Sequence, residues 1–289
     1  MVQAKAPHGV DAPGRAAIGK RTLRVDRWWA QPLVTWILLA IWVVYATVRA
    51  FTNKYFFAAQ TSYTAGGGGA VDPNLPHYLT PFASPCVTAT CPPQAQGFGQ
   101  WFGSWYPAFL PAALIALIFV LGFRVTCYYY RKAYYRSFWR SPSGCAVPEP
   151  HGKYTGETRF PLIIQNAHRY FFYAAFLVGL VLTWDVVDSL RHGFGFGTLL
   201  MAANAILLWC YTLGCHACRH VIGGRLKHFS AHPIRYKMWG WVSVLNGRHM
   251  QFAWTTLATL MLTDWYVWML AAHAAGAGYG FADLFYISF

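Results

Sequence analysis

Ligand-type side chains are concentrated in one stretch, Leu213 to Phe229, which reads LGCHACRHVIGGRLKHF. Cys215 and Cys218 are three residues apart and His216 and His220 are four apart, so on a helix each pair projects from its own face. Small Cys residues also pack well in apolar helices, and a His at a membrane border also meets water, so no single residue here identifies a site. The density of thiols and imidazoles nevertheless predicts a helix end that carries ligands.

Composition predicts an all-α integral membrane protein around this stretch. Of the 289 residues, 56% are hydrophobic, 18% are aromatic and only 11% are charged, which is too apolar for an ordinary soluble domain. The formal net charge is +14, but the basic residues recur between long apolar segments and form no continuous basic domain. We therefore expect membrane orientation, and not nucleic-acid binding, to explain the charge.

Five apolar segments are long enough to cross the hydrocarbon core of a bilayer as helices. We expect them at residues 31–51, 106–130, 162–188, 198–222 and 241–271. They divide the chain into a tail, residues 1–30, and a five-helix transmembrane domain, residues 31–289, that includes a long loop at 52–105.

The charges of the loops predict the orientation of these helices. Residues 131–160 and 223–239 are rich in Arg and Lys, which is typical of cytoplasmic loops, whereas residues 52–105 contain Lys54 as their one basic residue. The sequence therefore predicts a bacterial inner-membrane protein with its N-terminus in the cytoplasm, the 52–105 loop outside and its C-terminus outside.

The compartment of each loop also predicts whether its cysteines are oxidised or reduced. Cys86 and Cys91 lie close together in the outer loop, in SPCVTATCPP, and an oxidising compartment favours a disulfide between them over a metal site. Cys145 lies in a cytoplasmic loop and should be a reduced thiol.

Four side chains from four different crossings are expected at one depth in the membrane. His168 and His249 follow the starts of their helices by about two turns, roughly 9 to 12 Å, and Cys127 and Cys215 precede the ends of theirs by a similar distance. Ionisable or soft ligands at membrane depth normally face the interior of a bundle. The last four crossings are therefore expected to form a bundle that holds a cofactor.

The residues alone leave several cofactors and one other class of protein open. Two His on different helices could ligate a b-type haem, whereas two Cys and two His match a Rieske-type [2Fe–2S] cluster. A tetrahedral zinc would use the same four residues but would not explain their burial in a membrane. A transporter would usually show broken helices or paired acidic residues at the bilayer midplane, and here the ionisable groups gather on one side.

Five segments between Cys127 and Trp254 resemble the membrane anchor of type F succinate dehydrogenases, above all the mycobacterial enzymes. They read CYYYRKAYYRSFW, CAVPEP, QNAHRYFF, LGCHACRH and LNGRHMQFAW. The resemblance covers the last four crossings. It implies a subunit of respiratory complex II that docks to a flavoprotein and an iron–sulfur protein and passes electrons from succinate to quinone, menaquinone or ubiquinone, through a membrane-embedded Rieske-type cluster.

The resemblance also implies partner subunits, and it implies that this chain does not carry the whole activity. No GxGxxG dinucleotide fingerprint is present, so the flavin and the succinate site are expected on the partner subunits, and the chain alone should not oxidise succinate. Membrane lipids are further partners, and the complex could form a higher oligomer.

Carried over residue by residue, the resemblance implies a ligand set with one member from each helix. The first-choice metal ligands are Cys127, His168, Cys215 and His249, and Cys218 is the main rival of Cys215. His216 and His220 are second-choice imidazoles that could instead hydrogen-bond a quinone, a phospholipid or a docked partner.

Cationic and aromatic residues near these ligands predict a quinone pocket in the cytoplasmic leaflet. We expect it around Tyr128, Arg169, Arg248 and His220. Arg124 lies in the same region, and the default expectation for it is that it extends to the lipid headgroups, with tuning of the cofactor as the alternative. Asp264, in the outer half of the fifth crossing, is expected to cap or hydrate that end of the helix.

Overall fold

The computed structural model describes residues 26–52, 54–63, 69–103, 105–107, 110–111, 113–140, 144–147, 158, 160 and 162–289. Most of the predicted tail therefore lies outside the described residues. The chain divides into two compact units: unit 1 comprises Met1–Ile41 and Thr126–Asn166, and unit 2 comprises Trp42–Val125 and Ala167–Phe289. The prediction of one tail and one membrane domain stays a prediction.

The predicted all-α membrane fold is confirmed, because long apolar helices account for most of the described chain. Among the described residues, three helices are long and apolar enough to cross a membrane: α1 (Ala30–Thr52), the helix Ile163–His192 and α5 (Phe196–Leu213). A fourth is counted if α2 (Ala113–Thr126) and the helical segment Tyr128–Trp139 form one interrupted span. That the chain crosses the membrane five times stays a prediction.

Breaks in the helices correct the predicted boundaries of three crossings. The second crossing starts late, at Ala113, and is divided into α2 and α3 (Tyr128–Tyr134). The fourth is divided into α5 and α6 (His216–Gly223). The fifth is divided into α7 (Pro233–Gly247) and α8 (His249–Ala274), so the predicted basic loop is largely helical.

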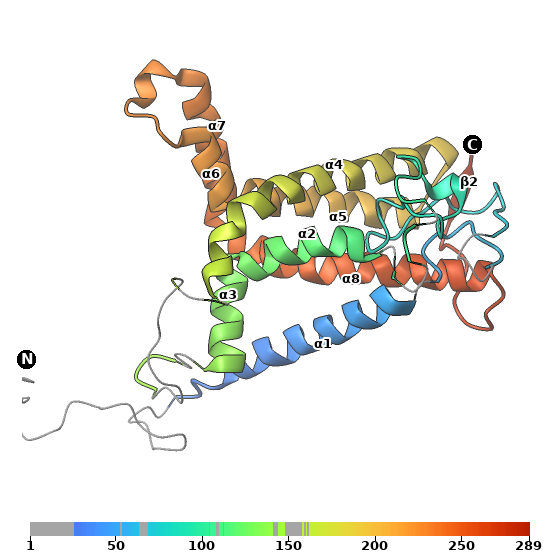
Figure 1. Ribbon diagram of the computed structural model, residues 1–289, viewed down its shortest axis with the longest axis horizontal. Coiled ribbons are helices and arrows are strands. Elements are labelled where there is room, and N and C mark those ends of the chain that lie inside the picture. Colours follow the sequence, from blue (N-terminus) through green and yellow to red (C-terminus); the bar gives the residue numbers. More distant parts are fainter. Residues whose placement is uncertain are drawn as a thin grey trace, which may run out of the picture. The chain divides into compact units, whose positions relative to one another are not determined.

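In unit 2, helices α2, α4 (His168–His192), α5 and α8 form a bundle (Figure 1). Helices α6 and α7 form a hairpin that projects from one end of this bundle, which we call the hairpin end. At the other end, the loop end, β1 (Gly193–Gly195) pairs antiparallel with β2 (Tyr286–Ser288).

The loop end has a core of its own. The predicted disulfide between Cys86 and Cys91 is confirmed, and both residues pack with Phe57, Leu79 and other apolar side chains. Tyr78 is fully buried and donates a hydrogen bond to Asp283 (2.8 Å). Burial raises the pKa of Tyr78, which keeps its hydroxyl protonated and able to donate. The long loop is thus a compact layer and not an open linker.

A buried ion pair joins α1 to α8 in unit 2. Arg49 Nε lies 2.7 Å from Asp264 Oδ2, and both side chains are 0% exposed. Tyr45 and Thr80 also donate hydrogen bonds to Asp264, and the Arg49 guanidinium lies 4.6 Å from the centre of a ring of Trp268. The expectation that Asp264 hydrates a helix end is therefore wrong, because its charge is neutralised inside the protein.

Unit 1 contains the first part of α1, helix α3 and two short segments, η2 (Tyr135–Trp139) and most of η3 (Leu162–Ala167). The rings of Trp36 and Phe138 lie 5.8 Å apart and connect α1 to η2. Cys145 is exposed.

Candidate metal centre

Each first-choice ligand lies at a junction between two helices. Cys127 precedes α3 with φ −66° and ψ 134°, and Cys215 precedes α6 with φ −68° and ψ 145°, so the two cysteines share one extended conformation. His168 is the first residue of α4, after η3, and His249 is the first residue of α8, after α7. The prediction of two imidazoles two turns inside continuous α-helices is therefore corrected: both stand at α-helix starts.

Within unit 2, the structure brings His168 and Cys215 into contact. His168 Nε2 lies 3.0 Å from Cys215 Sγ. The backbone N–H of Ala217 donates to the same sulfur (3.3 Å), and a donor at a helix N-terminus favours the thiolate that binds metal. Cys218 is buried inside α6 and is not at its start. This geometry favours Cys215 over Cys218 as a ligand.

A row of stacked rings connects the two imidazoles. His168 stacks on Phe123 with ring centroids 4.9 Å apart, and His249 stacks on Tyr211 at 4.8 Å. The Phe123 and Tyr211 rings are themselves in contact, 5.3 Å apart. His249 is only 1% exposed. Helices α2, α4, α5 and α8 therefore hold both imidazoles around one aromatic cluster.

Asn246 fixes the junction before α6 against the end of α7. Its amide donates to the carbonyl of Gly214 (2.7 Å) and its side-chain oxygen accepts from Arg219 (3.2 Å). Gly214 has to be small, because a Cβ there would lie 2.8 Å from the Cys210 carbonyl oxygen and 3.2 Å from the Leu245 backbone. These contacts determine where Cys215 lies relative to the start of α8.

Arg124 is a site residue whose burial the sequence did not indicate. The side chain is buried and does not extend to headgroups, which corrects the default expectation. It donates to the Ala253 carbonyl (3.4 Å) and to Thr256 Oγ1 (3.3 Å), and its guanidinium lies 5.1 Å from the centre of the Tyr211 ring. The available signal was its position in an apolar run three residues before Cys127.

An apolar cavity adjoins the aromatic cluster. Its polar lining comes from Arg124, Tyr211 and Thr212, and the rest is Phe123, other apolar side chains and glycine from the surrounding helices and the long loop. One aromatic ring therefore separates this cavity from His168 and one from His249. We refer to it as the Phe123 cavity.

The residues predicted to bind quinone are only partly brought together. Arg169 and His220 line one cleft, together with Tyr173, Arg225, Arg235 and neighbouring backbone. We call it the Arg169 cleft. Arg248 is not among its lining residues and is exposed just before α8. Tyr128 belongs to unit 1 and is half exposed.

The donor types fit an iron–sulfur cluster. Thiolate and imidazole are ligands for iron and zinc and not for hard cations such as magnesium. Cys215 and His168 already lie in contact, and His249 is buried in the same aromatic cluster. Cys127 is also buried, but it belongs to unit 1, so its membership of the ligand set stays a prediction. His216 and His220 are exposed.

The fold and these donors define a class of protein, an all-helical membrane subunit with Cys and His at its helix junctions. Residues 70–273 match the family of the actinobacterial succinate dehydrogenase subunit SdhC, and the chain belongs to that family. A solved structure, the Mycobacterium smegmatis Sdh1 complex in the apo form, is 55% identical over 96% of this chain and 99% of that chain, with a TM-score of 0.81. No curated protein sequence matches the chain.

The chain is therefore a membrane subunit of a succinate dehydrogenase and works in a multi-subunit complex. The resemblance noted from the sequence is confirmed. The transporter alternative is excluded by family membership, although the helices are broken as a transporter's often are. In this chain, Cys and His residues lie at the helix breaks.

Proposed function

We propose that this subunit anchors the complex and relays electrons to quinone through a Rieske-type [2Fe–2S] cluster. Cys127 and Cys215 would supply the thiolates, and His168 and His249 would supply the imidazoles. The contact of 3.0 Å between His168 Nε2 and Cys215 Sγ carries the proposal, because it joins a thiol and an imidazole from two helices. When bound, such a cluster accepts and donates one electron at a time.

The protein supplies the arrangement of the ligands. The Ala217 N–H stabilises negative charge on Cys215, and Asn246 holds the junction that carries this residue. Phe123 and Tyr211 fix the planes of the two imidazoles by stacking. Arg124 adds a fixed positive charge that favours electron acceptance nearby.

The Phe123 cavity is our preferred site for the quinone head group, whether menaquinone or ubiquinone. Its apolar lining suits a quinone ring, and Arg124, Tyr211 and Thr212 offer donors for the carbonyl oxygens. The Arg169 cleft offers three guanidinium groups and an imidazole, which suits an anion such as a lipid phosphate better than a neutral quinone. The cavity therefore replaces the pocket expected around Tyr128, Arg169 and Arg248 as the first candidate.

Partners and orientation follow the charge pattern. We place the hairpin end on the cytoplasmic side, where a flavoprotein and an iron–sulfur subunit would dock. The basic residues of the 223–239 segment and the disulfide at the loop end support this orientation. Electrons would then enter at the hairpin end, where His168, Cys215 and His249 lie.

Electron paramagnetic resonance of the reduced, purified complex tests the cofactor. A Rieske-type signal is expected. A pyridine haemochrome spectrum with stoichiometric haem b and no Rieske signal would favour the di-histidine haem alternative.

The double variant His168→Ala/His249→Ala tests the relay. It should lose the Rieske signal and quinone reduction, while succinate oxidation with a soluble artificial acceptor continues on the partner subunits. The matched control is His216→Ala/His220→Ala, which removes two exposed imidazoles and should keep both signal and quinone reduction. Normal quinone reduction by an assembled complex with the first pair of changes would refute the relay.

A further inference from the structure

The Arg169 cleft concentrates basic side chains in a part of the chain that has no acidic residue. Its basic lining comes from the start of α4 and from the hairpin of α6 and α7, and consists of Arg169, His220, Arg225 and Arg235. Neither residues 167–184 nor residues 189–263 contain Asp or Glu. The cleft is therefore suited to an anionic ligand.

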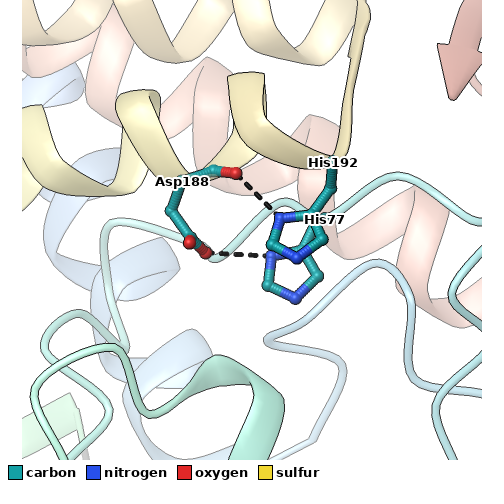
Figure 2. Close-up of side chains that lie close together, drawn as sticks. All are labelled: His77, Asp188 and His192. Carbon is teal, nitrogen blue, oxygen red and sulfur yellow. Dashed lines mark hydrogen bonds and ion pairs between the residues drawn. The ribbon is translucent and has the colours of Figure 1, made fainter. Parts of the chain in front are cut away.

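The acidic side chains of α4 and α8 lie toward the loop end of the bundle. Asp188 is 3.0 Å from Nδ1 of His77 (Figure 2), and Asp264 belongs to the buried ion pair of α8. Asp185 is the acidic residue of α4 nearest to Arg169, and about 24 Å of helix separates the two. Charges of exposed groups are largely screened beyond roughly 8 Å at physiological ionic strength, so these carboxylates do not neutralise the cleft.

The three guanidinium groups have donors available for a ligand. Arg169 and Arg225 make no hydrogen bond or ion pair to any described residue. Arg235 donates from Nε to the Ile222 carbonyl (2.7 Å) and from Nη2 to the Val221 carbonyl (3.4 Å), at the end of α6. These two bonds fix its guanidinium plane and leave Nη1 for another acceptor. A guanidinium is a planar fork of N–H donors whose geometry matches the oxygens of a phosphate.

The turn after α6 brings Arg225 to the cleft in a strained conformation. Gly224 lies against His220, and a Cβ there would be 2.3 Å from the His220 carbonyl oxygen and 2.8 Å from its Nδ1. Arg225 follows with φ 64°, in the left-handed region that is unfavourable for a residue with a side chain. Residues held in such conformations are concentrated at ligand sites, so the strain supports a binding role for Arg225.

An apolar stripe leads from the cleft along α4. Tyr173 lines the cleft itself, and Phe176 and Leu180 follow it at helical spacing. The three side chains are 48%, 37% and 50% exposed, on a helix that is long and apolar enough to cross a membrane. Phe176 also contacts Trp209 of α5, with ring centroids 5.0 Å apart, which widens the stripe. A soluble anion or an acidic peptide would use the cleft alone, whereas a phospholipid would use both the cleft and the stripe.

We propose that the Arg169 cleft binds the phosphate of an anionic phospholipid, whose acyl chains lie along Tyr173, Phe176 and Leu180. Basic pockets between membrane helices are typical sites for anionic lipid headgroups. Arg169 and Arg225 donate charge-assisted hydrogen bonds to the phosphate oxygens, and the Tyr173 ring lies at headgroup level. This site is independent of the iron–sulfur proposal.

Native mass spectrometry of the delipidated, purified complex tests the proposal. Wild type is titrated with phosphatidylglycerol and with phosphatidylcholine of the same acyl chains. We expect one phosphatidylglycerol per copy of this chain to bind first, at least about tenfold more tightly than phosphatidylcholine. Glycerol 3-phosphate has the phosphate without acyl chains and should bind at least about 100-fold more weakly. Equal affinity for the two lipids, or for phosphatidylglycerol and glycerol 3-phosphate, would overturn the proposal.

Arg169→Gln/Arg225→Gln removes two charges from the cleft and should abolish the preference for phosphatidylglycerol. The matched control, Lys227→Gln/Lys237→Gln, removes two exposed charges from the same hairpin outside the lining of the cleft, and should keep the preference. An equal loss in both variants would reduce the effect to net charge, and no loss in the cleft variant would place the lipid elsewhere; either result overturns the site.

The masses in the same spectra show whether each variant assembles with its partner subunits. If the cleft variant does not assemble, the comparison of the three ligands on wild type still decides the proposal. Failed assembly of that variant, together with no lipid preference in wild type, would assign the cleft to a docked protein and overturn the lipid site.

Discussion

Two arginines close to the candidate ligands differ in how deeply their side chains are buried. Arg124 is buried beside Tyr211, whereas Arg169 is exposed at the start of α4. A guanidinium inside a membrane bundle is costly, so its presence usually marks a functional position. Arg124 lines the Phe123 cavity, whereas Arg169 lines the Arg169 cleft.

We therefore expect Arg124→Gln to lower kcat/KM for quinone by roughly 10- to 100-fold, the range for losing a hydrogen bond from a charged donor. The Rieske signal should persist with an altered potential. Arg169→Gln is the matched control, and it should change quinone reduction less than about threefold. Steady-state kinetics with a soluble quinone measures both, and the reverse order of effects would move the quinone to the Arg169 cleft.

Residue types and spacing predicted that Cys215 and His168 lie at one depth in the membrane, although they are 47 residues apart in the sequence. Their contact could not be predicted from spacing alone, because it depends on how α4 and α5 end. Arg124 was misjudged for a related reason. Whether a basic residue near a helix end extends to headgroups or turns inward depends on which face the neighbouring helix covers, and the α2 sequence is apolar on all sides.

At the level of elements, the junctions control the site. Gly214→Ala should displace the start of α6, because its new Cβ would meet backbone atoms at 2.8 and 3.2 Å that cannot rotate away. We expect a loss of about 1–3 kcal/mol in stability, typical of overpacking, and a broadened Rieske signal. Gly247→Ala is the matched control, since a Cβ there meets nothing within 4 Å. Unchanged spectra for both variants would show that Cys215 is not positioned by this junction.

The ion pair between Arg49 and Asp264 makes a second prediction at this level. Asp264→Asn leaves a buried guanidinium without its counter-charge and should lower the free energy of unfolding by about 3–5 kcal/mol. The double change Arg49→Met/Asp264→Leu removes both charges and should recover much of the loss. Thermal unfolding of the complex in detergent measures these effects. If Asp264→Asn lowers the free energy of unfolding less than the double change does, the ion pair does not stabilise the packing of α1.

Helix breaks were the least predictable feature of the elements. Gly214 and Gly247 each come just before a break and could have indicated two of the three junctions in the divided crossings. The break at Cys127 has no such signal, because Val125, Thr126 and Tyr128 are ordinary residues in apolar helices. The late start of α2 follows Pro107 and Pro111, whose missing N–H groups are tolerated at a helix start but not inside it.

For the molecule as a whole, the orientation in the membrane is open to a direct test. Gln100, in the long loop, and Cys145 are both exposed and should lie on opposite sides of the membrane. A cysteine introduced by Gln100→Cys should react with a membrane-impermeant maleimide in intact cells. The native Cys145 should react only after permeabilisation, and Cys145→Ser gives the background. Labelling of both sites from the same side would contradict the proposed topology.

The position of the candidate ligands at junctions has a consequence for how the protein is made. Separate apolar helices can enter a bilayer one after another while the angles between them are still free. A metal cluster bound by four junctions would then act as a cross-link between distant parts of the chain, and its binding energy would add to folding energy. Biogenesis would thus have two stages, insertion followed by closure around iron. Cells short of iron should accordingly accumulate less of this subunit, in addition to losing its electron transfer.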